Sequence, residues 1–457
     1  MIGQPASLKT LLEYLRNPAT DEKKAILYQR WEALDPALKL PGQGFGQKAT
    51  GCGATIGIQP RCDFACTGCY LGVEANHVPA LPTAAILRQL DSLRAWLGPK
   101  SNVQISDGEV TLRPVEELTE ILRYARSIGI VPMVMTHGDS FRRRPGLLER
   151  LMEEGRLSEV SIHVDITQRG REGYGMPKSE GELMDLRGEL ADIVRTARRT
   201  TGRPLRAATT LTISRQNLDQ VADVVRWVIR NRDAFSLISF QPLAQVGRTR
   251  RGLEGVTAGE LWEEISHATA DFGLELPDRG AEPMHFGHPA CTRFVPVLAL
   301  EKRGESPRLF ELIRNQPEDV AVMQEFFTRG LGGVAFRDDL PIEALARAAG
   351  LFRAAPGWFL GPVRRWADSR LSEEAGTSLG RLFADALRGR VRVDGLTLTS
   401  HHFMSPAELR TEEGRQRLDA CVFRLSYKED MVPMCKMNAD GVRDQLYADI
   451  IDGTPVH

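Results

Sequence analysis

Three closely spaced cysteines are the residues of this chain best suited to bind a metal centre. Cys62, Cys66 and Cys69 lie at i, i+4 and i+7 within residues 61–70. Three thiolates on one short loop can bind three irons of a [4Fe–4S] cluster, which four cysteines would normally saturate, so the fourth iron is left for a ligand that is not protein. A structural zinc site is the alternative. Zinc prefers four ligands, usually in paired C-x2–4-C units, and here the next histidine is His77.

The cysteine loop comes directly after residues 54–60, which read as a short buried strand. A CxxxCxxC loop after such a strand resembles the cluster loop of the radical S-adenosylmethionine (SAM) superfamily. The resemblance implies that SAM ligates the open iron, and that an electron from the cluster cleaves SAM to a 5′-deoxyadenosyl radical. It also implies an electron-donor protein of the flavodoxin or ferredoxin type. Many members carry an aromatic residue before the third cysteine, whereas this chain has Gly68 there and Tyr70 after it.

Strand-like and helical runs alternate around this loop, from about residue 50 to 275. The strand-like runs are 54–60, 102–106, 131–136, 159–166, 206–213 and 236–242. The helical runs are 83–97, 115–128, 145–155, 181–199 and 217–231. Six such units predict an α/β fold with parallel strands and right-handed crossovers, a partial (β/α)6 TIM-like barrel. Ligands in such sheets bind at the carboxyl ends of the strands, which is where the cysteine loop begins.

Residues 105–114 follow the second strand-like run and resemble the Gly-Gly-Glu-Pro segment that binds the SAM ammonium group in the superfamily. Glu109 can accept hydrogen bonds from an amine, and Gly108 lets the backbone approach closely. Asp107 stands in place of the first glycine, and the proline is displaced to Pro114. An ordinary βα turn with an exposed acid is the alternative.

A row of polar residues marks the fourth strand-like run. Alternation places Ser161, His163 and Asp165 on one face, which suits a barrel interior that holds a polar ligand such as the ribose of SAM. His163 is a candidate catalytic residue, with a satisfied core histidine as the alternative. Arg215 ends the fifth run, where its guanidinium could pair with the SAM carboxylate. A helix cap or a surface role is the alternative for Arg215.

Four cysteines remain outside the loop: Cys52, Cys291, Cys421 and Cys435. They could complete a second iron–sulfur cluster or a mononuclear iron or zinc site. Simple packing is the alternative, because cysteine is readily buried as a small hydrophobic residue. Cys52 precedes the first strand-like run, so it joins the others only if the C-terminal region packs under the barrel. Three histidines are alternative fourth ligands: His288, His401 and His402.

Composition and patterning divide the chain into three regions. Residues 1–49 have helical period with proline breaks, 50–275 form the predicted barrel, and 276–457 mix helical segments and strands. This last region is expected to be an α+β domain that supplies the auxiliary metal site and the substrate region. Within it, residues 390–400 read as a hairpin with an Asp394-Gly395 turn.

Bulk properties exclude several classes of protein. The 457 residues include 59 Lys and Arg against 60 Asp and Glu, so no nucleic-acid footprint appears in the total. No apolar run approaches the ~20 residues that cross a bilayer. The first residues lack the pattern of a secretion signal, and an odd number of cysteines, seven, argues against a secreted disulfide scaffold. We therefore expect a cytoplasmic location.

The type of reaction rests on a second resemblance. The Gly-His-Pro-Ala-Cys segment that ends at Cys291, the Cys69-Tyr70 pair and the strand around His163 resemble one branch of the superfamily. That branch contains archaeal tetraether-lipid synthases and radical methyltransferases that act on pterin precursors. It implies a transferase that carries out methylation or C–C bond formation on a lipid-like or heterocyclic small molecule. The alternatives are a peptide- or protein-modifying enzyme with an auxiliary cluster, and a non-catalytic iron–sulfur binding protein.

Overall fold

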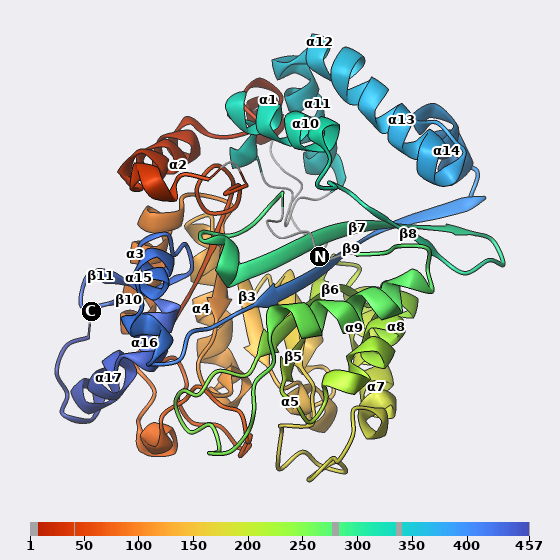
Figure 1. Cartoon of the computed structure of the whole chain (residues 1–457). Coiled ribbons are helices and arrows are strands. Elements are labelled where there is room, and N and C mark those ends of the chain that lie inside the picture. Colours follow the sequence, from red (N-terminus) through yellow and green to blue (C-terminus); the bar gives the residue numbers. More distant parts are fainter. Residues whose placement is uncertain (1–7, 41, 277–282, 335–340, 457) are drawn as a thin grey trace.

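A single eleven-stranded sheet organises the structure, a computed structural model that describes residues 8–40, 42–276, 283–334 and 341–456 (Figure 1). The strand order in the sheet is β11-β10-β1-β2-β3-β4-β5-β6-β9-β7-β8. Helices cover the outside of the curled sheet, so the protein has the predicted α/β class and the partial TIM-like barrel.

Six parallel strands form the centre of the sheet and follow one another both in sequence and in space, as predicted. They are β1 (Cys52–Ala54), β2 (Asn102–Ile105), β3 (Val131–Thr136), β4 (Glu159–His163), β5 (Arg206–Ile213) and β6 (Phe235–Pro242). The helices that connect or follow them are α3 (Thr83–Leu97), α4 (Val115–Ser127), α5 (Asp139–Arg143), α6 (Leu147–Glu153), α7 (Met184–Thr201), α8 (Val221–Arg230) and α9 (Ala258–Ala270). Alternate strand residues such as Val103, Val134 and Ile238 are fully buried in the core shared with these helices.

The first strand lies earlier than the sequence predicted. β1 ends at Ala54, and residues 55–59 continue as irregular backbone. The side-chain amide of Gln89 replaces the missing ladder, because its oxygen accepts from the Ile56 amide at 2.9 Å and its nitrogen donates to the Ile56 carbonyl at 2.7 Å. A buried apolar segment can therefore have its backbone hydrogen bonds satisfied by a side chain instead of a neighbouring strand. Apolar periodicity alone cannot distinguish such a segment from a strand.

The predicted hairpin at 390–400 is wrong. These residues form β9 (Val391–His401), one continuous strand that pairs in parallel with β6 and antiparallel with β7 (Thr292–Lys302). β7 pairs with β9 along its whole length, including Asp394 and Gly395. The long partner supplies the hydrogen bonds that a turn would otherwise have provided, so the Asp-Gly pair stays extended.

Residues after 275 extend both edges of the barrel sheet. β9, β7 and β8 (Arg308–Glu311) continue the sheet beyond β6. At the other edge, β10 (Arg424–Tyr427) pairs in parallel with β1, and β11 (Asp430–Pro433) pairs antiparallel with β10. The remaining helices in this part of the chain are α15 (Glu412–Asp419), α16 (Met434–Ala439) and α17 (Val442–Ile451). The C-terminal region thus lies beside β1, the strand that precedes the cysteine loop.

A group of helices, here called the helical cap, lies above the sheet at the top of Figure 1. Its members are α1 (Leu8–Arg16), α10 (Pro317–Thr328), α11 (Pro341–Ala354), α12 (Pro356–Trp358), a π-helical turn (Phe359–Val363), α13 (Arg364–Ala375) and α14 (Leu379–Leu387). The cap has a small core of its own around Leu331, Leu351 and Trp358. The other N-terminal helix, α2 (Asp21–Ala33), lies beside α3. No helix of the described residues is long and apolar enough to cross a membrane.

Candidate functional site

All seven cysteines line one cavity of about 800 Å³. The inward-facing residues of the parallel strands form one wall of it. They include Met133, Met135, Ser161, His163, Thr210, Thr212, Ser239 and Gln241. These residues alternate with the buried residues of the same strands, as the pleat of a strand requires. Ser161 and His163 therefore share a face as predicted, and Ser161 Oγ lies 2.9 Å from Thr210 Oγ1.

The cysteine loop is held by backbone hydrogen bonds to loops that follow other strands. The Ala65 amide donates to the Arg169 carbonyl at 3.0 Å, and the Thr67 amide donates to the Thr167 carbonyl at 2.8 Å. On its other side, the Arg250 amide donates to the Thr67 carbonyl at 2.8 Å. The loop after β4 and the loop after β6 thus clamp the cysteines over the carboxyl ends of the strands.

Glycines allow the close packing around this loop. A Cβ atom at Gly68 would lie 2.6 Å from Leu243 Cδ1, so no larger side chain fits there without displacing Leu243. This accounts for the missing aromatic residue before the third cysteine. A Cβ atom at Gly108 would lie 2.2 Å from the Pro60 carbonyl oxygen, so the close approach predicted for Gly108 is to the backbone at the start of the cysteine loop.

The electrostatics of two loop thiols, Cys62 and Cys66, fit a bound cationic cluster. Burial raises the pKa of Cys62 to about 12, and nearby Glu109 and Asp63 add to this effect. Burial and the two neighbouring thiols also raise the pKa of Cys66 well above its usual range. Thiols in such surroundings keep their protons unless a cation replaces them. Three half-buried thiols on one loop, facing a cavity, are the donor set that a [4Fe–4S] cluster with one open iron requires.

Arg248 is a functional candidate that the sequence reasoning missed. It lines the cavity beside the three cysteines, and its guanidinium donates to the Phe64 carbonyl at 3.3 Å. Burial alone would lower the pKa of Arg248, but the nearby Cys69 thiol raises it. The only sequence signal was the basic, glycine-containing run after the sixth strand, which is far more common as a solvated surface.

Another donor set near the loop consists of Cys62, Asp63 and His137, whose ligand atoms lie within 4.8 Å of one another. Asp63 is already engaged, because its carboxylate binds His137 Nε2 at 2.9 Å and the Arg143 guanidinium at 2.6 Å. Burial alone would raise the pKa of Asp63, but these two partners hold it well below its usual value. His137 also stacks on the Phe64 ring at 3.7 Å between centroids. This group therefore braces the loop rather than forming a metal site.

Glu109 lies in the cavity wall but is buried and strongly hydrogen bonded. Its Oε1 accepts from Thr136 Oγ1 at 2.7 Å and from Thr111 Oγ1 at 2.5 Å. Its Oε2 accepts from the His137 amide at 2.9 Å and lies 3.2 Å from His137 Nε2. An amine ligand at Glu109 would have to replace one of these donors.

Asp107, the departure from the family segment, has a structural partner far along the chain. Its Oδ1 binds the buried Arg443 guanidinium of α17 at 2.8 Å, and its Oδ2 accepts from the Gly57 amide at 2.8 Å. The Asp107 carbonyl accepts from the Tyr70 hydroxyl at 2.7 Å, and Arg443 lies over the Tyr70 ring at 5.0 Å. This network joins the residues on both sides of the cysteine loop to the C-terminal helix.

His163 and Asp165 form a close pair, with 2.5 Å between His163 Nε2 and Asp165 Oδ2. Asp165 is fully buried and also accepts from the Thr212 amide at 2.6 Å and the Thr167 amide at 2.7 Å. Burial alone would raise the pKa of Asp165, but His163 and these donors lower it to about 2. Asp165 lies beyond the end of β4 and orients His163, which lines the cavity.

Arg215 lies outside the group of residues that the cavity brings together. Its side chain is about half exposed and forms an ion pair with Glu260 of α9 at 2.7 Å. The Arg215 amide donates to the Glu254 carbonyl at 2.9 Å. These contacts are those of the surface role that was the alternative interpretation.

A second set of cysteines gathers from three separate segments. Cys291 precedes β7, Cys421 follows α15, and Cys435 lies in α16. Burial raises the pKa of Cys421 to about 12, and the nearby Cys291 and Cys435 add to the shift. Arg417 Nε donates to Cys291 Sγ at 3.4 Å, and the Met404 amide donates to Cys435 Sγ at 3.4 Å. The second set thus repeats the features of the loop: three half-buried thiols that face the cavity beside an arginine.

The candidate fourth ligands of the second set also line the cavity. The His402 amide donates to the Cys291 carbonyl at 2.8 Å, and His402 Nε2 lies 3.0 Å from Ser400 Oγ. Burial lowers the pKa of both His401 and His402 to about 4, which keeps the rings neutral. Cys52 lies within β1, next to β10, not before the strand as predicted.

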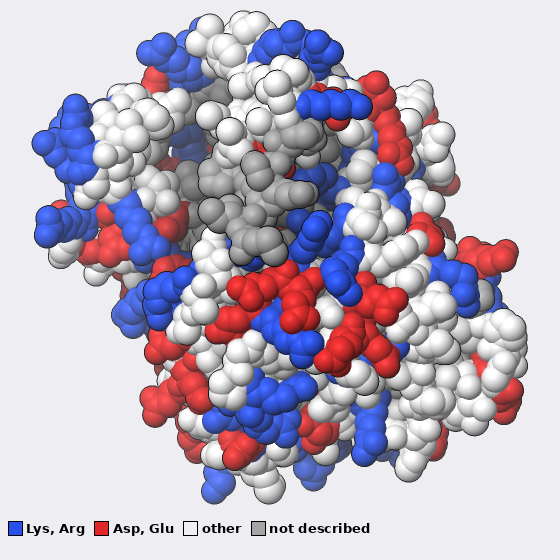
Figure 2. Space-filling model, turned by 180° about the vertical axis from the view of Figure 1, so that it is seen from behind, with Lys and Arg blue, Asp and Glu red and all other residues white. Residues whose placement is uncertain are grey.

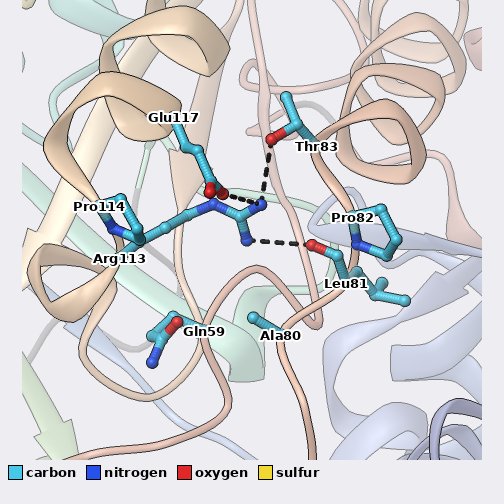
Figure 3. Close-up of a pocket in the computed structure, with 8 residues that line it drawn as sticks. All are labelled: Gln59, Ala80, Leu81, Pro82, Thr83, Arg113, Pro114 and Glu117. Atoms are coloured by element: carbon cyan, nitrogen blue, oxygen red, sulfur yellow. Dashed lines mark hydrogen bonds and ion pairs between the residues drawn. The ribbon is translucent and has the colours of Figure 1, made fainter.

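A smaller cavity of about 510 Å³ lies beside the segment that leads to the cysteine loop (Figure 3). Arg113 extends across it and donates to the Leu81 carbonyl at 3.0 Å and to Thr83 Oγ1 at 3.1 Å. It also forms an ion pair with Glu117 at 2.8 Å and donates to the Ile58 carbonyl at 2.6 Å. These bonds fix the segment before the cysteines, and they leave the guanidinium engaged with protein.

Comparisons with known proteins give a partial likeness to solved structures. The chain is similar in structure to SuiB of Streptococcus suis bound to S-adenosylmethionine, with 14% identity, a TM-score of 0.35 and coverage of 48% of this chain and 47% of SuiB. It is also similar to anSMEcpe with bound AdoMet, with 11% identity, a TM-score of 0.35 and coverage of 48% and 60%. The match thus spans about half of SuiB and three fifths of anSMEcpe. No curated protein sequence matches the chain.

One stretch of the sequence matches a family model. Residues 56–228 match the sequence model of the radical SAM superfamily, and this range contains the cysteine loop and β2 to β5. The likeness of the chain to the radical SAM superfamily is therefore carried by its segment 56–228.

Proposed function

We propose that this protein is a radical SAM enzyme that cleaves SAM at a [4Fe–4S] cluster held by Cys62, Cys66 and Cys69. The observation that carries the proposal is the clamped loop itself. Its three half-buried thiols lie within the segment that matches the superfamily model, and they face a cavity that Arg248 also lines. When bound, the cluster supplies the electron that cleaves SAM to the 5′-deoxyadenosyl radical. A flavodoxin- or ferredoxin-type protein donates that electron in this proposal.

The chain's own residues would position SAM from several strands. Gly108 and Glu109 approach the cysteine loop from β2, and Ser161 and His163 present polar atoms from β4. Asp165 acts through His163, whose ring it holds in one orientation. Arg215 is left out of this set, because its guanidinium is engaged by Glu260 at the surface.

We further propose that the substrate is lipid-like or heterocyclic, and that the reaction is methylation or C–C bond formation. The support is the lining of the cavity, which is largely apolar away from the cysteines. Apolar residues come from the barrel, from the C-terminal segments and from the inner side of the cap. They include Met133, Leu237, Phe286, Phe294, Phe326, Trp358, Phe359, Phe403 and Met434. A largely apolar cavity with a few placed polar groups favours such ligands over highly charged ones.

Cys291, Cys421 and Cys435 are proposed as ligands of a second metal centre in the same cavity. Their mutual proximity and their raised thiol pKa values support this assignment. A set of three thiolates fits an iron–sulfur cluster better than a zinc ion, which normally takes four protein ligands in a structural site. His402, whose amide donates to the Cys291 carbonyl, is the proposed fourth ligand.

The direct test is production of 5′-deoxyadenosine from SAM under anaerobic, reducing conditions. The wild-type protein should form it, and Cys62→Ala should form none. Cys52→Ala is the matched control, because it removes a cavity-lining thiol outside the loop and should leave cleavage intact. Continued cleavage of SAM by the Cys62→Ala variant would rule out the proposed function.

A further inference from the structure

The loop that follows β6 packs against the cysteine loop and carries Arg248 with it. The Arg248 amide donates to the Leu71 carbonyl at 2.8 Å. The Thr249 hydroxyl accepts from the Cys69 amide and donates to the Cys69 carbonyl, in both cases at 3.3 Å. A Cβ atom at Gly247 would lie 2.3 Å from the carbonyl oxygen of the residue after Cys69, so the two loops meet backbone to backbone there. The main chain of Arg248 is therefore fixed beside the third cysteine.

The guanidinium of Arg248 carries a hydrogen-bond donor that the protein leaves unused. Its Nη2 donates to the Phe64 carbonyl, within the cysteine loop, at 3.3 Å. Its Nε is buried and has no hydrogen-bond partner among the described residues. Buried N–H groups normally have a partner. Because Arg248 lines the cavity with the three cysteines, the unused donor indicates an acceptor that belongs to a group bound there.

Arg248 also lacks an acidic partner. Basic and acidic side chains lie next to each other over the surface seen in Figure 2. Arg143, another arginine beside the cysteine loop, is likewise paired with Asp63 at 2.6 Å. Among the described residues, however, no carboxylate forms an ion pair with Arg248. Burial alone would lower the pKa of Arg248, and the groups that raise it are the loop thiols, with Cys69 first. The anions expected beside this guanidinium are therefore cysteine sulfurs.

A cluster on this loop would be an anion, because three thiolates outweigh the dipositive core of an oxidised [4Fe–4S] cluster. One electron from the donor protein adds a further negative charge. A fixed cation beside the cluster stabilises the reduced state more than the oxidised state, because the attraction grows with the negative charge of the cluster. We propose that Arg248 is the counter-cation of the cluster on the cysteine loop and raises its reduction potential. This inference deepens the proposed function and rests on it, since it requires that Cys62, Cys66 and Cys69 hold a cluster.

The test is the midpoint potential of the loop cluster in the reconstituted full-length protein, followed by electron paramagnetic resonance during an anaerobic redox titration. The loop cluster is identified as the one whose signal changes when SAM is added afterwards. In Arg248→Gln, the ratio of reduced to oxidised cluster at the wild-type midpoint should fall about tenfold, a negative shift of about 59 mV for one electron. Arg248→Lys keeps the positive charge and should recover most of the shift.

Arg250→Gln is the matched control. Arg250 is exposed and outside the cavity lining, and the bond that holds its segment to the cysteine loop comes from its backbone amide, which donates to the Thr67 carbonyl. This variant should keep the wild-type potential, so a loss of positive charge near the loop is not enough to cause the shift.

A purely structural role for Arg248 gives a different result. Arg248→Gln and Arg248→Lys would then both bind less iron, and the cluster that remains would keep the wild-type potential. Equal potentials in wild type and Arg248→Gln overturn the proposal, as does a shift in Arg248→Lys as large as that in Arg248→Gln. Failure of the proposed function would appear in wild type itself, as the absence of a cluster signal that responds to SAM, so the two failures are distinguishable.

Discussion

The two cysteine sets of this protein reach the same cavity by opposite routes. Cys62, Cys66 and Cys69 lie on one loop of a parallel strand, and local spacing alone brings them together. Cys291, Cys421 and Cys435 lie in three segments that meet only because β7 pairs with β9 and β10 pairs with β1. The first set can therefore be recognised in the sequence as a motif. The second depends on the long-range order of the sheet.

The comparison also shows that the local set is not independent of the rest of the chain. Arg443, 336 positions from Asp107, binds that residue beside the cysteine loop and stacks on Tyr70. Single substitutions can show how far the two sets are independent of each other.

Replacing Arg443 should produce the largest loss. Arg443→Met leaves the buried Asp107 carboxylate unpaired, and breaking a buried pair costs about 3–5 kcal/mol. Burial already raises the pKa of Asp107, and Arg443 opposes this. Without Arg443 the folded-state pKa rises further, so the loss relative to wild type should grow as the pH rises above the already raised pKa of Asp107 in the wild-type protein. The free energy of unfolding, measured by chemical denaturation at several pH values, gives this loss. Recovery of stability in the double variant with Asp107→Asn is the control, and a loss below about 1 kcal/mol would contradict the account.

A methyl group at Gly108 should disturb the loop set without touching the second. The new Cβ of Gly108→Ala would meet the Pro60 carbonyl oxygen at 2.2 Å, and backbone cannot yield as a flexible side chain can. We expect a loss of about 1–3 kcal/mol in stability. We also expect reduced iron at the loop, followed by absorbance after reconstitution. Gly188→Ala is the matched control, because a Cβ there has open space. Equal behaviour of the two variants would show that the packing is looser than described.

Arg417 should matter to the second set alone. Arg417→Gln removes the cation that donates to Cys291 Sγ, and loss of such an outer partner typically lowers metal affinity about tenfold or more. Cleavage of SAM should persist. Iron retained during titration with a chelator gives the measurement, and an unchanged titration would argue that the second thiols are packing residues only.

Arg215 should have the smallest effect. Its ion pair with Glu260 is at the surface, and such pairs contribute about 0–1 kcal/mol. Arg215→Ala should therefore leave the apparent KM for SAM unchanged, in contrast to Arg248→Ala at the cysteine loop. An increase in KM for Arg215→Ala would restore its predicted contact with the SAM carboxylate.

The sequence was sufficient for the features that local patterns determine. Apolar periodicity located β2 to β6 and their helices, and spacing identified Cys62, Cys66 and Cys69. Alternation correctly placed Ser161 and His163 on the inner face of β4. Each of these inferences needs only neighbours within a few residues.

The sequence was insufficient where distant partners decide the outcome. Asp394-Gly395 has the chemistry of a turn, yet a full-length partner strand keeps it extended. Residues 54–60 have the apolar character of a strand, yet Gln89 satisfies the backbone of Ile56 instead. The roles of Asp107 and Arg248 likewise depend on partners that no local spacing indicates.

The central claim is that two separate thiol sets each hold a metal centre in one cavity, and that only the loop set cleaves SAM. The most direct measurement is iron and acid-labile sulfide per chain after anaerobic reconstitution, for wild type and two triple alanine variants. The account predicts about eight irons in wild type and about four in each variant, with SAM cleavage lost only when Cys62, Cys66 and Cys69 are replaced. About four irons in wild type, unchanged when Cys291, Cys421 and Cys435 are replaced, would contradict it.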